Sequence, residues 1–299
     1  MPESTGPLVG PVLPPEDRSK REVATTQTAP PTTRKLFARG WPGRDRKTPK
    51  YRLWRVAGYA LFIGVWALLA AYVFEPFQLP SPMKVVEEML EILRSGDFWT
   101  TIWATTKQLA IGFSIAFVLG TTIGILMGRS AYWDGFFRDY VMLTLTTPGL
   151  VFALIAVLIF GLSNFGPIVA IVLTTLPHVT VNVVEGVRAI PRDLIDMSTS
   201  FGVSRTARVR TILIPAVAPF LFTAVRYGFA IAWKITALTE LFGGADGIGI
   251  QIRVEFQLFN TAGVLAWAFF LTGLSLITER LVLQRMEDHF FRWRMKAYG

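Results

Sequence analysis

The chain has 299 residues, of which 52% are apolar and only 17% are charged. Soluble globular domains carry about a quarter charged residues, so this composition argues against a soluble enzyme. The chain has no cysteine and two histidines, His178 and His289, which excludes disulfides, thiolate nucleophiles and cysteine or histidine metal clusters. No cofactor is expected. The net charge of +9 indicates either nucleic acid or an anionic membrane surface as a partner.

Residues 1–50 are predicted to be a disordered, proline-rich, basic tail ahead of a membrane domain at 51–299. The tail holds half of the chain's 18 prolines and has no apolar periodicity. It therefore cannot bury enough surface to offset the entropy lost on ordering. A signal peptide is not expected, because the first apolar run lies too deep in the chain and no small-residue cleavage pattern follows it.

Long apolar runs alternate with short polar breaks from residue 54 onward. In a helix, each run spans roughly 30 Å, which is the thickness of a bilayer core. Backbone groups have no water partners in lipid, so such runs must be helical. We therefore predict an all-α membrane protein with six transmembrane helices. They are expected at about 54–74, 108–128, 141–162, 167–187, 220–243 and 263–283.

The second of these runs contains glycines on one helix face, at Gly112, Gly120, Gly124 and Gly128. Small residues at such spacing let a neighbouring helix approach closely. The alternative is the ordinary enrichment of glycine in membrane helices.

The distribution of positive charge predicts the orientation in the membrane. Lys and Arg are concentrated before residue 56, at 129–140, at 188–218 and after 283. They are sparse at 75–104, 163–166 and 244–262. The positive-inside rule therefore places both termini and the two basic loops in the cytosol. The net charge is then explained by anionic lipid or a cytosolic partner, and nucleic acid is not needed.

The most informative polar stretch is the loop 189–219. Asp193 lies at the expected start of a helix on which Leu194, Met197 and Phe201 share one face. Such a helix exposes a narrow apolar stripe, which suits insertion into a groove of another protein. The alternative is an amphipathic hairpin that lies on the lipid surface.

The remainder of this loop predicts a turn and a second helix. Gly202 is expected to be the left-handed residue that follows the first helix. Ser204 can cap a second helix at 205–214, which Pro215 is expected to end. Arg205 lies at its start.

These residues resemble the "EAA" loop of binding-protein-dependent ABC importer permeases of type I. The family pattern is Glu-Ala-Ala, three residues, Gly, nine residues, then Ile-x-Leu-Pro. It is matched in order by Asp196, Gly202, Ile212 and Pro215. This chain departs from it with Asp196 for Glu, Met197-Ser198 for Ala-Ala and Ile214 for Leu.

The finer pattern is similar to the nitrate, sulfonate and taurine branch of that family. Three short segments carry this likeness: Leu79-Pro80-Ser81-Pro82, Met127-Gly128-Arg129-Ser130, and Thr239-Glu240-Leu241 with Gly247-Ile248-Gly249.

The resemblance implies a permease subunit in the cell inner membrane that forms the pathway for a small solute, an anion such as nitrate, a sulfonate or taurine. It implies a separate cytosolic ATPase, a second permease copy as in a homodimer, an extracytoplasmic substrate-binding protein and surrounding membrane lipid. The chain itself contains no G-x-x-x-x-G-K-[ST] loop to hold ATP phosphates. The residues expected to couple to the ATPase are Asp193, Asp196, Met197, Phe201, Gly202, Ser204, Arg205 and Pro215. Asp196 either pairs with a cation on the ATPase or complements its own helix N-terminus.

Three ionisable residues within the apolar runs are candidates for the translocation pathway: His178, Lys234 and Glu240. An intramembrane charge is costly and therefore indicates function by default. Lys234 either attracts an anionic substrate or forms a structural pair between helices. Glu240 needs compensation near a helix C-terminus, for which Arg253 is the candidate. His178 follows Pro177, and the alternative to a ligand role is a hydrogen-bonded residue at a kink.

The segments 76–98 and 244–260 are each expected to contain a helix outside the membrane. They are candidates for docking the binding protein, or else interfacial helices that only seal the membrane surface.

A stand-alone secondary transporter is the alternative function, and a membrane-embedded enzyme is a further one. Secondary transporters show internal repeats and paired charges at mid-membrane, and no convincing repeat relates spans one to three with spans four to six. A membrane enzyme would need clustered His, Asp or Glu residues, which this chain lacks.

Overall fold

The computed structural model describes residues 49–280, within which the regular structure is helical and contains no strand. The predicted tail, apart from its last two residues, lies outside this range, as do the end of the sixth predicted span and the basic C-terminal segment. The chain divides into two units, 1–61 and 62–299. The boundary falls inside the first described helix, α3 (Pro49–Tyr72).

Helix α4 (Pro82–Arg94) is the amphipathic helix expected between the first two spans. It begins at a capping residue, because the Ser81 hydroxyl accepts a hydrogen bond from the Lys84 N–H at 3.3 Å and Pro82 occupies the first turn. Its buried residues, Val85 and Ile92, pack in an apolar cluster with Phe98 and Trp267.

The core of the second unit is formed by α5 (Phe98–Arg129) and α8 (Phe165–Arg188), which pack along their length. The glycine face of α5 lies against α8. A Cβ at Gly112 or Gly120 would lie 2.9 Å from an atom of α8, and one at Gly124 would lie 2.7 Å from the Val183 Cβ. The prediction of a close-approach face is confirmed, because any larger side chain there would overlap α8.

The third predicted span is not a continuous helix. It consists of α6 (Ala131–Thr146) and α7 (Gly149–Phe160), which are bent by 96° at a short break. Pro148 lacks an N–H and forces the preceding Thr147 into an extended conformation, so the helix must end there. Residues 131–140, expected to be a loop, are also helical. Five described helices are long and apolar enough to cross a membrane, and the six predicted crossings require the bent pair to count as one.

The polar loop forms α9 (Arg192–Ser200) and α10 (Arg205–Arg208), and the chain stays helical from there to Gly243. It passes through a π-helix, η1 (Val209–Leu213), into α11 (Ile214–Gly243). The prediction that Pro215 ends the second helix is therefore wrong. The wider π turn comes directly before Pro215, which lies in the first turn of α11, where a missing N–H costs little.

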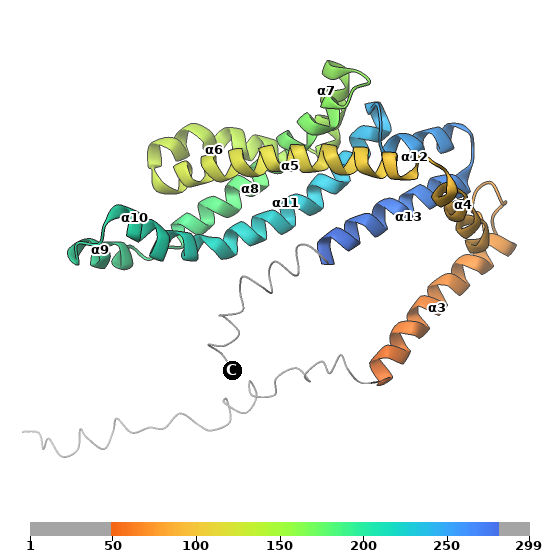
Figure 1. Cartoon of the computed structure of the whole chain (residues 1–299), viewed down its shortest axis with the longest axis horizontal. Helices are drawn as coiled ribbons and strands as arrows, with labels where there is room; N and C mark the ends of the chain where they lie inside the picture. The colour runs from red at the N-terminus through yellow and green to blue at the C-terminus, as the bar shows by residue number, and fades with distance from the viewer. Residues whose placement is uncertain (1–48, 281–299) are drawn as a thin grey trace, which may run out of the picture. The chain divides into compact units, whose positions relative to one another are not determined.

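Two further helices complete the described residues, α12 (Ile248–Gln257) and α13 (Thr261–Thr278). In Figure 1, α9 and α10 lie at one end of α5, α8 and α11, and α12 lies at the other end together with α4. We call these the hairpin end and the distal end.

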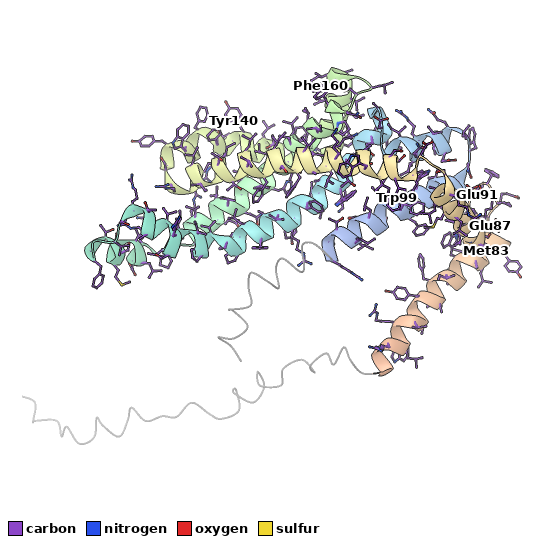
Figure 2. All side chains as sticks on the ribbon, in the orientation of Figure 1. Met83, Glu87, Glu91, Trp99, Tyr140 and Phe160 are labelled. Atoms are coloured by element: carbon purple, nitrogen blue, oxygen red, sulfur yellow. The ribbon has the colours of Figure 1, made fainter. Side chains whose placement is uncertain are left out.

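Figure 2 shows that many side chains on the outside of this unit are apolar, among them Trp99, Tyr140 and Phe160. Exposed apolar surface on this scale is unusual for a soluble monomer, and it is what a bundle surrounded by lipid or by partner subunits presents. The acidic side chains labelled in the same view, Glu87 and Glu91, lie on α4 at the distal end.

Candidate functional site

The turn after α9 closes by the glycine-dependent hydrogen bonds of a Schellman motif. Gly202 has φ +67, its N–H donates to the Thr199 carbonyl at 3.0 Å, and the Val203 N–H donates to the Ser198 carbonyl at 3.0 Å. The Ser204 hydroxyl then accepts from the Ala207 N–H at 3.3 Å, which caps α10 as predicted. The sequence therefore specifies this turn locally.

Helix α9 has one attached face and one free face. Ser198 is buried and Ile195 packs against the cluster around Val183 and Val187, which attaches the helix to the hairpin end of the bundle. The predicted apolar stripe faces outward, because its members are 42% (Leu194), 52% (Met197) and 79% (Phe201) exposed.

The polar residues predicted around this stripe are also exposed. Asp193, Asp196 and Arg205 are accessible and form no ion pair with any residue from 49 to 280. Gly202 is open as well, since no atom lies within 4 Å of where its Cβ would be. Pro215 is separated from the stripe by the turn, α10 and η1.

Glu240 is fully buried at the distal end of α11 and is held by hydrogen bonds from two other segments. Its Oε2 accepts from the Thr105 hydroxyl of α5 at 3.1 Å and from the Gly249 N–H at 2.8 Å. The Thr105 hydroxyl oxygen also accepts from the Ile248 N–H at 2.8 Å. The carboxylate therefore faces the N-terminus of α12, whose unpaired N–H groups and dipole favour negative charge.

Arg253 is not the partner of Glu240, contrary to the expectation from the sequence. Its guanidinium donates to the Phe242 carbonyl at 3.3 Å, near the C-terminus of α11. The space beside the carboxylate is instead left by Gly247, which has φ +129 and where a side chain would overlap Glu240. This geometry favours a structural role for Glu240 over contact with a transported solute.

His178 is half-buried in α8 and bonds within its own helix. Its Nδ1–H donates to the Thr174 carbonyl at 2.9 Å, and its own carbonyl accepts from the Asn182 amide at 2.8 Å. Pro177 lies inside the helix directly before it. These bonds support the interpretation of His178 as a kink residue.

Lys234 lies on the exposed face of α11, while Trp233 and Ile235 on either side of it are buried. Its ammonium has no ion-pair partner among residues 49–280. The structural pair between helices is therefore not formed within this part of the chain. A charge at this depth needs a wet cavity or a second chain against it.

Comparison with known proteins identifies the family. Residues 120–292, more than half of the chain, match the family described as "Binding-protein-dependent transport system inner membrane component". The chain belongs to this family. It is thus the membrane-spanning permease subunit of an ABC importer, a multi-pass inner membrane protein, and the resemblance noted in the loop 189–219 is confirmed.

Several named permeases align over most of the chain. The formylaminopyrimidine transport permease protein ThiX of Halalkalibacterium halodurans is 25% identical over 80% of this chain and 94% of its own length. The nitrate import permease protein NrtB of Synechocystis is 25% identical, over 75% and 84% respectively. The bicarbonate transport system permease protein CmpB of Synechococcus elongatus is 26% identical, over 77% and 87%. Nothing in these similarities supports a stand-alone secondary transporter.

A solved structure shares the fold of the permease. A chain of the inward-facing MetNI methionine ABC transporter superposes with a TM-score of 0.55 at 20% identity, covering 69% of this chain and 97% of that one. At this identity the likeness establishes the all-α importer fold and no more.

Sequence analysis missed a polar network at the distal end of the permease, formed by Gln108, Asn164 and Asp246. It also missed Thr105, which links Glu240 to α12. The sequence does contain an indication of this network in α5, where the polar residues Thr105 and Gln108 interrupt an apolar helix face one turn apart. Their partners lie 56 or more residues away and could not be identified from spacing.

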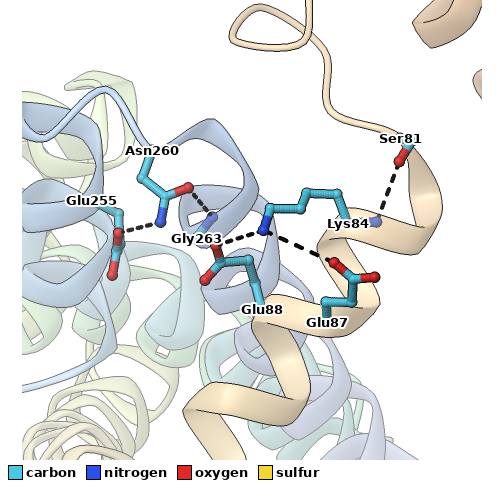
Figure 3. Close-up of polar contacts among 7 residues, drawn as sticks. All are labelled: Ser81, Lys84, Glu87, Glu88, Glu255, Asn260 and Gly263. Carbon is cyan, nitrogen blue, oxygen red and sulfur yellow. Dashed lines mark hydrogen bonds and ion pairs between the residues drawn. The ribbon is translucent and has the colours of Figure 1, made fainter.

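The distal surface also carries a group of charged and polar residues on α4, on α12 and at the start of α13 (Figure 3). The Lys84 ammonium lies 3.9 Å from the Glu87 carboxylate and 4.0 Å from that of Glu88. Asn260 donates to Glu255 at 2.9 Å and caps α13 by accepting from the Gly263 N–H at 3.2 Å. These bonds order the two helices predicted outside the membrane.

Proposed function

We propose that this permease transmits ATP-driven movement to the transport pathway through α9. The observation that carries the proposal is the free apolar stripe of Leu194, Met197 and Phe201 on a short helix attached to the end of the bundle. A stripe of this width fits a hydrophobic groove of a partner subunit. Lipid-surface docking is the competing interpretation, and the test below separates the two.

A separate cytosolic subunit binds and hydrolyses ATP in this proposal. The permease has no phosphate-binding loop, so its own part is mechanical. The ATPase contacts α9 differently in its open and closed states, and this difference shifts the permease between two conformations. Asp196 and Arg205 flank the stripe and would pair with charges on that subunit. The hairpin end, and with it both termini, is then cytosolic, as the positive charges predict.

A second copy of the permease completes the pathway in this proposal. The exposed face of α11 carries Tyr227 and Lys234 among smaller residues. Lys234 has no ion-pair partner within the described chain, and a mid-membrane ammonium facing lipid would be unfavourable. We therefore place this face along the pathway between two permeases.

The transported solute is proposed to be a small anion such as nitrate, a sulfonate or taurine. The cation Lys234 supports this, as do the substrates named for the nitrate and bicarbonate permeases that align with the chain. A binding protein would deliver the solute at the distal end, where α4 and α12 present the charged surface of Figure 3.

The test is co-purification of the tagged full-length permease with the ATPase subunit expressed beside it. Phe201→Ser with Met197→Ser removes the two most exposed side chains of the apolar stripe and should lower the recovered ATPase about tenfold or more, as loss of an interface hot spot does. Phe256→Ser is the matched control, because Phe256 is equally exposed on α12 at the distal end. Unchanged recovery with the double variant would contradict the assignment of α9 and favour a hairpin that rests on lipid.

A further inference from the structure

A cavity of about 380 Å³ lies at the distal end, where α5 passes the start of α8 and the α11–α12 loop. Its lining includes two aromatic side chains, two amides and two opposite charges: Trp103, Lys107, Gln108, Asn164, Phe165 and Asp246. None of these residues takes part in the hairpin described above.

The amide of Gln108 has a fixed orientation that leaves its oxygen without a partner. Its Nε2 donates to the Asn164 Oδ1 at 3.1 Å and to the Asp246 carbonyl at 3.2 Å, and both of these atoms are acceptors. The amide atom that faces these two acceptors must therefore be the nitrogen, and the remaining amide atom is the oxygen, Oε1. This oxygen is buried, since Gln108 as a whole is only 4% exposed, and it accepts no hydrogen bond from residues 49–280. This oxygen has almost no accessible surface, so the role of Gln108 in the cavity is to hold Asn164 and Asp246 in place through its Nε2.

The two charges that line the cavity do not neutralise each other. Asp246 accepts a hydrogen bond from the Asn164 amide at 3.2 Å, but no ion pair joins it to Lys107. The Lys107 ammonium has no partner within the described range. A ligand that satisfies this cavity carries an anionic group for Lys107 and a cationic N–H donor for Asp246.

The cavity lies at the level of the membrane interface. Lys107 directly precedes the apolar run at 108–128, and Trp99 and Trp103 are exposed on α5 just before it, as in the aromatic belt of membrane proteins. From Ile111, which lines the cavity, the exposed side chains of α5 continue apolar toward the hairpin end at Ile115 and Val118. An apolar ridge that leads away from a polar cavity suits acyl chains joined to a headgroup.

We infer that this cavity binds the headgroup of a phospholipid that carries a phosphate and a primary ammonium, as phosphatidylethanolamine does. The phosphate pairs with Lys107. The ammonium donates to the Asp246 carboxylate. A choline headgroup has no N–H to donate, and a glycerol headgroup has no cation for Asp246. The inference does not rest on the proposed coupling role of α9.

The experiment is native mass spectrometry of the full-length permease in mild detergent. Phosphatidylethanolamine, phosphatidylcholine and phosphatidylglycerol with identical acyl chains are added in turn, and the lipid-bound fraction is measured. The wild type should retain the ethanolamine lipid about tenfold better than either of the others, and Lys107→Gln should lower retention of all three, because each carries the phosphate. Lys84→Gln is the matched control, because it removes an exposed lysine of the same surface outside the cavity. Asp246→Asn tests the contact with the ammonium and should lower retention of the ethanolamine lipid alone.

Equal retention of the three lipids by the wild type would overturn the inference, as would unchanged retention by Lys107→Gln. A second arm adds soluble glycerophosphoethanolamine, which has the same headgroup and no acyl chains. Failure of this compound to displace the lipid at equal concentration supports a lipid site. Displacement at equal concentration would overturn the lipid assignment and indicate a site for a free zwitterion.

Discussion

Glu240 shows how a single charged residue is accommodated in an apolar helix. Its carboxylate cannot pair along α11, because no basic residue lies within reach on the same helix face. Its Oε2 instead accepts from the Thr105 hydroxyl and from the Gly249 N–H at the N-terminus of α12, while Oε1 is buried without a partner among the described residues. Glu240 therefore ties three segments together, and the glycines beside it leave room for α12 to approach.

Replacing Glu240 tests this structural role. Glu240→Leu leaves the Gly249 N–H and the Thr105 hydroxyl buried without an acceptor, which costs about 1–3 kcal/mol for each unsatisfied group. We expect a clear fall in the thermal unfolding temperature of the purified permease, and a smaller fall for Glu240→Gln, which keeps one acceptor oxygen. Glu91→Leu, an exposed acidic residue of α4, is the control. If Glu240→Leu unfolds at the same temperature as Glu91→Leu, the carboxylate is not a structural tie.

Gly202 is required for its backbone conformation, since its surroundings are open. At φ +67, a β-branched residue is strained by about 1–2 kcal/mol or more, whereas asparagine tolerates this region. We expect Gly202→Val to reduce substrate-stimulated ATP hydrolysis by the reconstituted transporter, and Gly202→Asn to retain most of it. Gly135→Val, at another glycine with open surroundings, serves as control. Equal hydrolysis by Gly202→Val and Gly135→Val would remove the turn from the coupling mechanism.

At the scale of elements, the sizes of the facing residues determine how closely α5 and α8 pack. Every fourth position of α5 from Gly120 to Gly128 is a glycine, and each lies against a valine of α8. The valines fill the space that the absent side chains leave, so the helix axes come close along their whole contact. Helices α6 and α7 show the opposite case, in which Pro148 alone interrupts an apolar run.

Enlarging one glycine of this contact should separate the helices. Gly124→Leu would place its side chain where Val183 now lies, and overpacking of this kind costs about 1–3 kcal/mol. A lower unfolding temperature and a lower yield of folded permease are expected. Gly273→Leu lies in an equally apolar helix with no atom within 4 Å, and should be tolerated. Equal loss of stability in both variants would mean that the cost arises from the helix itself and not from the contact.

At the scale of the whole molecule, the number of membrane crossings depends on the bent pair. If α6 and α7 together cross once, the described chain crosses six times and its two ends lie on the same side. If the pair enters and leaves on one face, the count is five and the ends lie on opposite sides. The positive-inside pattern favours six, because it places 129–140 and 188–218 on the same side.

Single-cysteine labelling distinguishes these topologies without background, because the chain has no native cysteine. Tyr132→Cys lies in the first turn of the bent pair, Leu162→Cys follows the pair, and both positions are exposed. A membrane-impermeant maleimide should label them from opposite sides of the membrane, with Phe201→Cys reacting from the same side as Tyr132→Cys. Labelling of Tyr132→Cys and Leu162→Cys from one side would show a re-entrant pair and reverse the predicted placement of one end.

Much of the candidate site was predictable because its signals are local. The left-handed Gly202, the cap at Ser204 and the stripe through Phe201 depend on residues within about three turns of one another, so spacing alone indicated them. The prediction for Pro215 was wrong because proline ends a helix only from its interior. In the first turn of a helix it is tolerated, and here a wider π turn comes directly before it. The break at Pro148 was missed because the apolar run continues through it, and hydrophobicity does not report a bend.

The sequence by itself determined the class of the protein, the approximate position of each apolar run and the hairpin between the fourth and fifth. These follow from run length, from the need of every backbone group for a partner in lipid, and from short-range capping rules. Only the tertiary structure decided what Glu240 bonds to, which face of α9 is free, and that Gln108, Asn164 and Asp246 meet at one cavity. Those contacts join residues up to 138 positions apart, and their identity depends on how whole helices pack rather than on any local pattern.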